Sequence, residues 1–259
     1  MNPLLEVKDV CLSYHSLSGE TAALSHISFH LMPEGFLAVV GPSGCGKSTL
    51  LNLICGLLHA ESGTILMNGK LLNKDSARIG YMLQKDHLLE WRSIYRNVLL
   101  GLEIQGELTK DNLSYVDELL KLYELDKFRD SRPSQLSGGM RQRAALIRTL
   151  ALKPDLLLLD EPFSALDYQT RLNVSDDIGK ILKKQRKPAI LVTHDISEAI
   201  SMADRVLVLS HRPATVKSIH RIELDIASED AVAMRRSARF NEYFDQIWSD
   251  LDIQVQAMA

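Results

Sequence analysis

The stretch Phe36-Leu-Ala-Val-Val-Gly-Pro-Ser-Gly-Cys-Gly-Lys-Ser48 says more about the fold than any other part of the chain. Its first five residues are apolar, as in a buried β-strand. Residues 41–48 then match the spacing Gly-x-x-x-x-Gly-Lys-Ser of a phosphate-binding loop. Glycines let such a loop turn tightly, so that backbone N–H groups face one anion, and the following helix presents its positive end. We therefore predict a strand, a phosphate-binding loop and a helix from about residue 47 to residue 58.

The same loop contains the groups that bind a nucleoside triphosphate. In a loop of this type Lys47 places its charge beside the β- and γ-phosphates, and the hydroxyl of Ser48 is a ligand for Mg²⁺. We expect the chain to bind and hydrolyse ATP with Mg²⁺; a glycine-rich turn without a ligand is the alternative. Cys45 lies inside the loop and is interpreted as a small filler residue, with a redox role as the alternative.

Short apolar runs alternate with helical patterns along the rest of the chain, which is typical of an α/β fold with a largely parallel sheet. The pair Asn68-Gly69 favours a type I′ turn and predicts a hairpin around it. The expected strands, besides residues 36–40, are residues 64–67, 70–72, 79–83, 156–159, 189–193 and 205–209.

Helix formers dominate from Gln84 to Pro154, which indicates a helical lobe inserted into the α/β core. The end of the chain is also helical in pattern, with one apolar stripe formed by Phe240, Tyr243, Phe244, Ile247, Trp248 and Leu251. We interpret this stripe as packing on the chain's own core; a dimer or partner contact is the alternative. The expected parts are a core at about 1–84 and 155–225, a lobe at about 85–154 and a tail at about 226–259.

Net charge, cysteine content and the length of apolar runs argue against several classes of protein. The 259 residues carry a formal charge of -3, which gives no electrostatic reason to expect nucleic acid as a partner. Three cysteines, without a Cys-x-x-Cys pair, suggest neither a disulfide framework nor a zinc site. We find no signal-peptide pattern and no apolar run of about 18 residues. We therefore expect a cytosolic protein, or one attached to a membrane through a partner.

Polar residues follow three of the expected strands. Asp160 and Glu161 come directly after an apolar strand, and ligands in parallel sheets lie at such strand ends. We predict that Asp160 holds Mg²⁺ through water and that Glu161 orients or deprotonates the attacking water. Gln84 offers a neutral oxygen to the metal, and His194 senses or polarises the γ-phosphate; a structural histidine is the alternative.

The segment Leu136-Ser-Gly-Gly-Met140 precedes a helical run and predicts a second anion site at a helix N-terminus. A capping turn is the alternative, because Ser137 is a good N-cap residue. One nucleotide hardly needs two such sites in one chain.

These motifs together resemble those of the ATP-binding-cassette (ABC) ATPases, over nearly the whole chain. The loop resembles the Walker A motif, residues 136–140 the signature, residues 156–161 Walker B with its catalytic glutamate, and residues 164–167 the D-loop ending at Asp167. The resemblance implies a P-loop NTPase core with a mostly parallel sheet, an amino-terminal antiparallel β region and an inserted helical lobe. It makes Gln84 the Q-loop glutamine and His194 the switch histidine.

The resemblance also implies site residues. Tyr14 matches the aromatic that stacks on adenine; an ordinary strand tyrosine is the alternative. The implied catalytic residues are Glu161, His194 and Lys47. The implied metal-binding residues are Ser48, Gln84 and Asp160. The implied ATP-binding residues are Tyr14, Gly41, Pro42, Ser43, Gly44, Cys45, Gly46, Lys47, Ser48, Thr49 and Gln84.

In this family two subunits meet head to tail. The resemblance therefore implies a homodimer or paired cassette, in which Ser137, Gly138 and Gly139 close over the ATP bound by the other chain. ATP binding would close this interface and hydrolysis would open it.

Within the family the chain is most similar to cassettes of the nitrate/sulfonate/taurine importer branch. This implies separate permease subunits docking near Gln84–Asn97, at the cytoplasmic face of the cell membrane, and a periplasmic or extracellular solute-binding protein. Trp91 lies in that docking segment, with local packing as the alternative. An exporter or lipoprotein-release cassette, or a soluble ABC ATPase acting on nucleic acid or ribosomes, is the alternative function.

Overall fold

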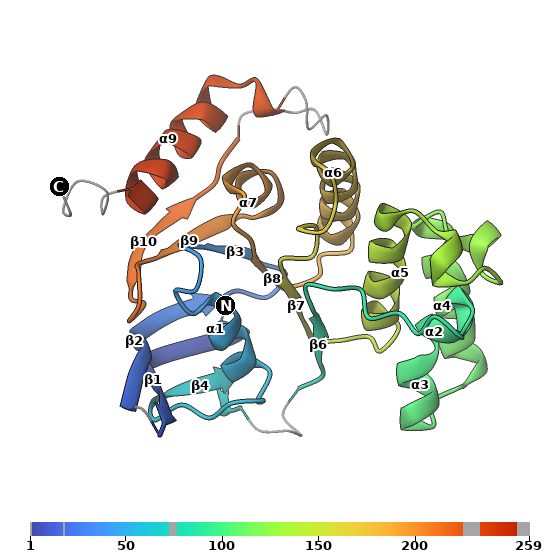
Figure 1. The fold of residues 1–259 in the computed structure, drawn as a ribbon, viewed down its shortest axis with the longest axis horizontal. Coiled ribbons are helices and arrows are strands. Elements are labelled where there is room, and N and C mark those ends of the chain that lie inside the picture. Colours follow the sequence, from blue (N-terminus) through green and yellow to red (C-terminus); the bar gives the residue numbers. More distant parts are fainter. Residues whose placement is uncertain (1, 18, 73–76, 225–233, 253–259) are drawn as a thin grey trace. The chain divides into compact units, whose positions relative to one another are not determined.

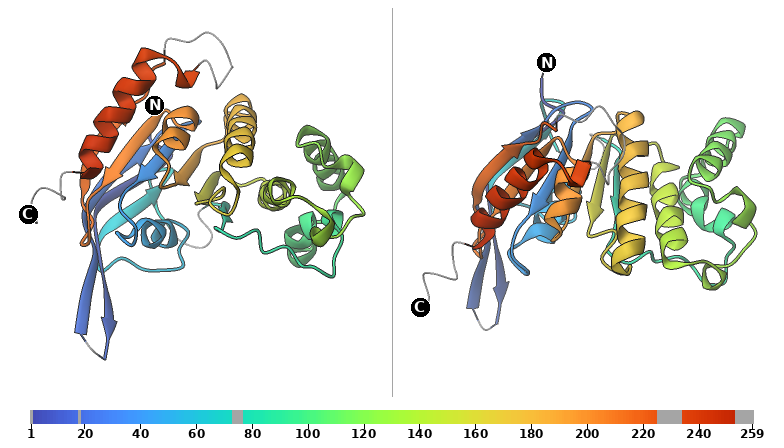
Figure 2. Two further views of the ribbon diagram at one scale, coloured as in Figure 1. Left: turned by 45° about the horizontal axis from the view of Figure 1, so that its top comes forward. Right: turned by 90° about the horizontal axis from the view of Figure 1, so that it is seen from above.

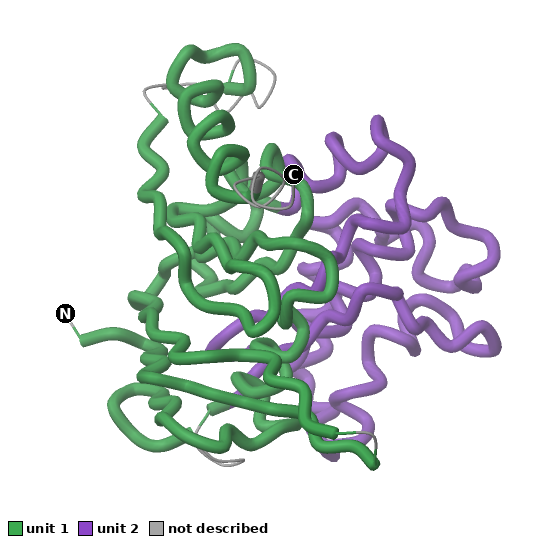
Figure 3. The backbone as a smooth tube through the Cα atoms, turned by 60° about the vertical axis from the view of Figure 1, so that its left-hand side comes forward, with its two compact units in different colours: residues 1–77, 179–259 green, residues 78–178 purple. Residues whose placement is uncertain are grey.

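The computed structural model describes residues 2–17, 19–72, 77–224 and 234–252. Its backbone divides into two compact units (Figure 3). Unit 1 consists of residues 1–77 and 179–259, and unit 2 of residues 78–178. The boundaries expected for the core, the lobe and the tail stay a prediction.

Unit 1 contains an antiparallel sheet with the strand order β2-β1-β4-β5 (Figure 1). Its strands are β1 (Leu5–Ser16), β2 (Gly19–Leu31), β4 (Ser62–Met67) and β5 (Lys70–Leu71). Between β4 and β5, Asn68 and Gly69 have φ angles of 52° and 74°, the positive values that a type I′ turn requires. The predicted hairpin is confirmed, although β4 begins two residues before the expected strand. Figure 2 shows β1 and β2 extending as a two-stranded ribbon.

A second set of strands in unit 1 runs in the order β10-β9-β3-β8. Its members are β3 (Phe36–Val40), β8 (Ala189–Val192), β9 (Arg205–Leu209) and β10 (Val216–Arg221). β3 is parallel to both β8 and β9, whereas β10 is antiparallel to β9. All residues of β3 and β8 are buried, which explains their continuous apolar sequences. Backbone hydrogen bonds of Ser25 and Ala23 with Ala214 tie β2 to this second set.

The helices of unit 1 include α1 (Lys47–Ile54), α7 (Ile196–Met202) and α9 (Ala238–Asp252); α6 (Tyr168–Lys184) begins in unit 2 and ends in unit 1. The expectation that α1 reaches residue 58 is wrong. Gly56 adopts a left-handed φ of 76°, and the N–H of Leu57 donates to the carbonyl of Asn52 at 2.9 Å. This Schellman-type ending stops the helix at Ile54.

Unit 2 combines two parallel strands with a group of helices. They are β6 (Ile79–Met82), α2 (Ile94–Val98), α3 (Leu100–Gln105), α4 (Lys110–Leu122), α5 (Gly138–Leu150) and β7 (Leu156–Asp160). A Cβ at Gly80 would lie 2.8 Å from Thr149 Cγ2 and 2.9 Å from Pro154 Cγ. Only glycine at this position lets β6 approach the end of α5 so closely.

The predicted helical tail is α9, which contacts α7, β9 and β10 (Figures 1 and 2). Phe240 and Ile247 are buried, so these two members of the stripe belong to the chain's own core. Trp248 is 54% exposed and stacks on Phe244. Asp250 fastens the end of the helix by accepting hydrogen bonds from Ser218 and His220 of β10. No helix in the described part of the chain is long and apolar enough to cross a membrane.

Candidate functional site

The phosphate-binding loop joins β3 to α1, as the sequence predicts. Gly44 and Gly46 have φ angles of 73° and 126°, which side chains disfavour. A Cβ at Gly46 would also lie 2.9 Å from Leu24 Cδ2 and 3.2 Å from the carbonyl oxygen of Ala23. The second glycine of the motif is therefore required both by backbone conformation and by contact with β2.

Lys47 is the first residue of α1, and its side chain folds back onto the loop. Its Nζ donates hydrogen bonds to the carbonyl oxygens of Gly41 at 2.8 Å and Pro42 at 3.0 Å. Only 6% of the residue is exposed. The ammonium group is thus held within the curve of the loop, next to a helix N-terminus, and both features attract an anion.

Tyr14 and Thr49 connect β1 to α1. The hydroxyls of Tyr14 and Thr49 are 3.0 Å apart. Tyr14 is 41% exposed, so its ring is partly accessible from the surface. The structure thereby places the expected adenine-stacking residue in contact with the helix that follows the phosphate loop. Ser48, on the same helix, is exposed.

The other loop residues divide into exposed and buried groups. Ser43 and Gly44 are exposed, whereas Gly41, Cys45 and Gly46 are buried. Burial raises the pKa of the Cys45 thiol above its usual value, although the charge of Lys47 acts in the opposite direction. A buried, protonated thiol is a poor nucleophile, which supports the interpretation of Cys45 as a filler.

His194 is exposed and lies between β8 and α7 in unit 1. Its neighbours on both sides are fixed. The Thr193 hydroxyl donates to buried Glu198 at 2.6 Å and accepts a hydrogen bond from the N–H of Asp195 at 3.0 Å. Asp195 caps α7 by accepting from the N–H groups of Ser197 and Glu198. These contacts hold the backbone at His194 in one conformation.

In unit 2, Asp160 is the last residue of β7 and is 8% exposed. The hydroxyl of Tyr81, on β6, donates a hydrogen bond to its Oδ2 at 3.1 Å. A carboxylate this deeply buried needs hydrogen-bonding or charged partners.

Glu161 follows directly, with a φ of 45°. The Gln84 side-chain amide donates to Ser164 Oγ at 3.3 Å and, over a longer 3.5 Å, to Glu161 Oε2. The Ser164 hydroxyl in turn donates to the Glu161 carbonyl oxygen at 2.9 Å. Unit 2 therefore brings together the predicted Q-loop glutamine and the predicted catalytic glutamate, linked through Ser164.

The signature segment forms the start of α5. Exposed Ser137 is its N-cap and accepts a hydrogen bond from the N–H of Met140 at 3.3 Å. The capping turn is thus present, and the second anion site stays a prediction. A Cβ at Gly138 would lie 2.9 Å from Leu166 Cδ2, and one at Gly139 would lie 2.9 Å from Val174 Cγ2. Gly139 is therefore required by close packing on α6, whereas a side chain at Gly138 would displace the end of Leu166 in the D-loop.

Asp167, the predicted D-loop aspartate, is exposed. It accepts a hydrogen bond from the N–H of Thr170 at 3.1 Å. Hydrogen bonds with Thr170 lower the pKa of the Asp167 carboxyl below its usual value, so it is ionised at neutral pH. The carbonyl oxygens of Ser164 and Leu166 accept hydrogen bonds from Arg171, which stabilises the D-loop from within unit 2.

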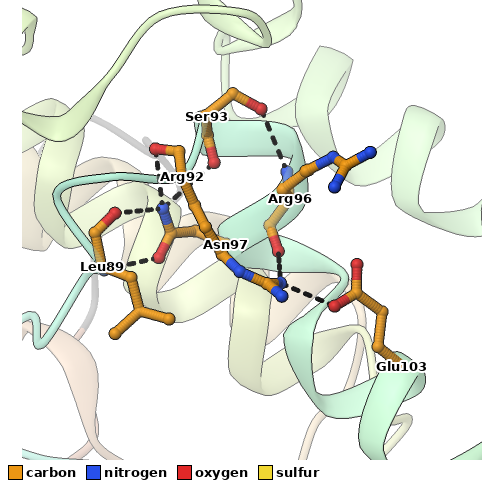
Figure 4. Close-up of polar contacts among 6 residues, drawn as sticks. All are labelled: Leu89, Arg92, Ser93, Arg96, Asn97 and Glu103. Atoms are coloured by element: carbon orange, nitrogen blue, oxygen red, sulfur yellow. Dashed lines mark hydrogen bonds and ion pairs between the residues drawn. The ribbon is translucent and has the colours of Figure 1, made fainter.

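The segment Gln84–Asn97 is ordered around one buried amide. Asn97 accepts from the N–H of Leu89 at 2.7 Å and donates to the carbonyl oxygens of Leu89, Arg92 and Ser93 (Figure 4). An ion pair of 2.6 Å between Arg92 and Glu103 lies beside it. The segment thus has a defined shape.

Two arginines of α5 hold the start of this segment. Arg141 forms an ion pair with Asp86 at 3.1 Å. Arg148 donates to the carbonyl oxygens of Asp86 at 2.6 Å and His87 at 2.8 Å. Trp91 is 73% exposed in the same segment, so local packing does not account for its indole. The segment Gln84–Asn97 and the helix α5, which carries the predicted signature, are therefore directly connected.

The candidate metal ligands are all oxygen donors, the type that Mg²⁺ prefers: the Asp160 carboxylate, the Ser48 hydroxyl and the Gln84 amide oxygen. Within the described ranges, no three His, Cys, Asp or Glu side chains cluster as a metal site of their own. Mg²⁺ in nucleotide sites characteristically takes one or two carboxylates together with substrate phosphates. The types of these donors, taken residue by residue, suit a metal that binds with its nucleotide.

The comparison with known families decides what this set of motifs is. A family model described as ABC transporter matches residues 24–164. The chain belongs to the ABC transporter family. It is an ATP-binding cassette with an ATPase domain, as the sequence predicts.

Related sequences cover nearly the whole cassette. It is 44% identical over 248 residues to the uncharacterized ABC transporter ATP-binding protein YtlC of Bacillus subtilis, covering 96% of this chain and 95% of the relative. It is 39% identical to the taurine import ATP-binding protein TauB of Rhizobium johnstonii, covering 94% of this chain and 95% of that protein.

Solved structures confirm the predicted fold class. The cassette MJ0796, solved as a dimer in a post-hydrolysis state with ADP and Pi, matches with a TM-score of 0.71 and 28% identity, over 85% of this chain and 99% of that chain. The protein cbiO1 of Clostridium perfringens, part of the transporter complex cbiONQ, matches with a TM-score of 0.76 and 25% identity, over 95% of this chain and all of that chain.

Two residues that shape the site, Tyr81 and Asn97, have no role in any of the predicted motifs. They act through hydrogen bonds that depend on strand register or loop folding. Glu198 differs from them, because Asp195 followed three residues later by a glutamate is a recognisable helix start.

Proposed function

We propose that the cassette is the ATP-hydrolysing subunit of an ABC importer for a small solute of the nitrate, sulfonate or taurine class. The observation that carries this proposal is the similarity to three taurine import ATP-binding proteins, at 37–39% identity over at least 90% of the chain.

In this proposal the loop of unit 1 binds the phosphates of ATP. Backbone N–H groups of residues 41–46 and the Lys47 ammonium group neutralise phosphate charge, and Thr49 and Tyr14 connect the loop to the adenine-binding strand β1. The position of Lys47 supports this assignment, because two hydrogen bonds hold its ammonium group at the loop.

The hydrolytic groups are Glu161 and His194. The Glu161 carboxylate orients the attacking water and accepts its proton, while His194 polarises the γ-phosphate. Gln84 contacts Glu161 through its amide and through Ser164, so the position of the glutamate depends on the Q-loop. When bound, Mg²⁺ supplies charge neutralisation at the phosphates; Asp160, Ser48 and Gln84 would hold it.

Two copies act together, head to tail, so that Ser137, Gly138 and Gly139 of each serve the ATP of the other. Exposed Ser137 at the N-terminus of α5 supports this, because a helix start presents N–H groups to an anion. The exposed charge of Asp167 lies on the adjoining D-loop.

A permease subunit docks on the segment Gln84–Asn97, with exposed Trp91 as an anchor, and holds the cassette at the cytoplasmic face of the membrane. A solute-binding protein delivers the solute. Arg148 and Arg141 link this segment to the signature helix, and Gln84 links it to Glu161. Movement of the permease would thereby be transmitted both to the signature helix and to Glu161.

Deletion of the gene in its host tests the importer assignment. The deletion strain is grown with taurine, an alkanesulfonate or sulfate as sole sulfur source, and with nitrate or ammonium as sole nitrogen source. We expect loss of growth on one of the transported candidates but not on sulfate or ammonium, with rescue by the wild-type gene and not by Lys47→Ala. Normal growth of the deletion strain on all candidates would contradict this solute class.

A further inference from the structure

The hydrogen bond between Tyr81 and Asp160 follows from the register of β6 and β7. Tyr81 pairs with Leu158 in this parallel ladder. Side chains alternate along a strand, so Asp160, two residues after Leu158, lies on the same face as Tyr81. A diagonal neighbour of this kind is within reach of an aromatic side chain. The phenol spans the gap and its hydroxyl meets Oδ2 at 3.1 Å.

The opposite face of β6 fixes the position of this phenol. The neighbouring residue Gly80 packs against Thr149 and Pro154, where a Cβ would already lie under 3.0 Å from both side chains. There is thus no room for a side chain between this point of β6 and the end of α5, and the strand packs closely there. Its register with β7 is also set, because a slip of one residue would move Tyr81 to the α5 face.

A hydrogen bond to one oxygen restricts the rotation of a carboxylate. The terminal torsion of an aspartate is broad and roughly two-fold, so packing alone selects its plane weakly. A donor at a fixed position selects one orientation, and hydrogen bonds to charged groups are the stronger ones. The phenol is a donor of this kind, since its ring is anchored in a strand.

We infer that Tyr81 is a positioning residue for Asp160: its hydroxyl sets the direction in which the carboxylate faces Mg²⁺. The inference rests on the proposed function, in which Asp160 contributes to metal binding. It predicts that the Tyr81 hydroxyl affects the affinity for the metal and leaves the affinity for the nucleotide alone nearly unchanged.

The test compares Tyr81→Phe with two reference variants. Asp160→Asn removes the charge that the hydroxyl orients. Tyr123→Phe is the matched control, because the Tyr123 hydroxyl is buried in unit 2 without a hydrogen-bond partner among the described residues. Binding of Mn²⁺ to each ATP-loaded protein is measured by electron paramagnetic resonance. Binding of a fluorescent ATP analogue is measured in EDTA, and hydrolysis is titrated with Mg²⁺.

We expect Tyr81→Phe to weaken Mn²⁺ binding, and to raise the half-saturating Mg²⁺ concentration, by about tenfold, the effect of losing one hydrogen bond to a charged group. Nucleotide binding in EDTA and kcat at saturating Mg²⁺ should stay within about twofold of wild type, as should all values for Tyr123→Phe.

The outcomes separate this inference from the proposed function. If Asp160→Asn weakens Mn²⁺ binding and Tyr81→Phe does not, the role of Tyr81 is wrong and that of Asp160 stands. If Asp160→Asn leaves Mn²⁺ binding unchanged, the metal role of Asp160 fails and the inference fails with it. A loss of nucleotide binding in EDTA by Tyr81→Phe would show general damage and would also overturn the positioning role.

Discussion

Glu161 combines an unusual backbone conformation with hydrogen bonds to Ser164 and Gln84, two residues of the predicted motifs. Its φ of 45° lies in the left-handed region, which non-glycine residues seldom adopt and which costs of order 1 kcal/mol. Hydrogen bonds from Ser164 and Gln84 stabilise this conformation. Strain of this kind persists where the surroundings hold a residue in place, and it concentrates at functional sites.

Replacing Glu161 by Gln tests this role by kinetics. The amide keeps the shape of the side chain but is not a base, so turnover should fall by roughly 10²–10⁴-fold while ATP binding is retained. Steady-state phosphate release and fluorescent ATP binding are the measurements. Glu118→Gln, at an exposed position on α4, is the control and should match wild type. Near-normal hydrolysis by Glu161→Gln would remove it from the mechanism.

Lys47→Ala addresses the binding step. The variant loses a buried ammonium group that is fixed at the phosphate loop, and ATP affinity should fall by about 100-fold, the upper end of a charge-assisted hydrogen-bond contribution. Equilibrium titration with a fluorescent ATP analogue measures the change. Lys121→Ala, at an exposed site on α4, should bind ATP as wild type does. Equal affinities for the two variants would contradict the assigned role of Lys47.

Tyr123 offers a test of stability at the residue scale. Its ring is fully buried, and its hydroxyl has no partner among the described residues; burial raises the pKa of this phenol well above its usual range. Tyr123→Phe removes an unsatisfied polar atom, so the free energy of unfolding should stay the same or rise by about 1 kcal/mol. Urea unfolding checks this; a loss above about 1 kcal/mol would reveal a hydrogen bond that the structure does not show.

At the scale of elements, the sequence predicted what depends on local signals. The Asn68-Gly69 hairpin, the buried strands and the phosphate loop all follow from turn chemistry or apolar runs. The early end of α1 was also readable, because Gly56 is a C-terminal signal that our expected boundary passed over. The helices α6 and α7 were not anticipated, although Val174, Ile178 and Leu182 show helical spacing.

The residues of the candidate site also fall into two groups, those with a local sequence signal and those without one. The motif residues could be named from the sequence alone, because binding a phosphate or supplying a carboxylate at the site requires a particular residue type at a fixed spacing. The supporting residues could not, since the contact of Tyr81 with Asp160 requires the β6–β7 register, and that of Asn97 with Leu89 requires the fold of a loop. Such contacts arise from tertiary structure, and no local pattern encodes them.

Asn97 holds together the fold of the segment Gln84–Asn97, on which we propose that the permease docks. It is fully buried and bonds four backbone groups, so Asn97→Ala leaves an N–H and three carbonyl groups without this partner. We expect a loss of about 2–4 kcal/mol in the free energy of unfolding. Asn112→Ala, at a half-buried site on α4, is the matched control and should cost about 1 kcal/mol or less. If urea unfolding gave the same loss of stability for Asn97→Ala and Asn112→Ala, the structural role assigned to Asn97 would be wrong.

At the scale of the whole molecule, the chain has one phosphate loop and one signature segment. The loop belongs to unit 1 and the signature to unit 2. A head-to-tail pair would give each ATP a loop from one copy and a signature from the other. We therefore propose that ATP joins two copies of this chain.

The most direct test is the mass in solution of Glu161→Gln and of the double variant Glu161→Gln with Ser137→Arg, with and without ATP and Mg²⁺. Light scattering should show Glu161→Gln passing from its own 29.0 kDa to a dimer when ATP is added. The double variant should bind ATP equally well and stay at 29.0 kDa, because the long charged side chain introduced by Ser137→Arg would obstruct the signature of each copy. Dimerisation of both variants at the same ATP concentration would contradict the composite site.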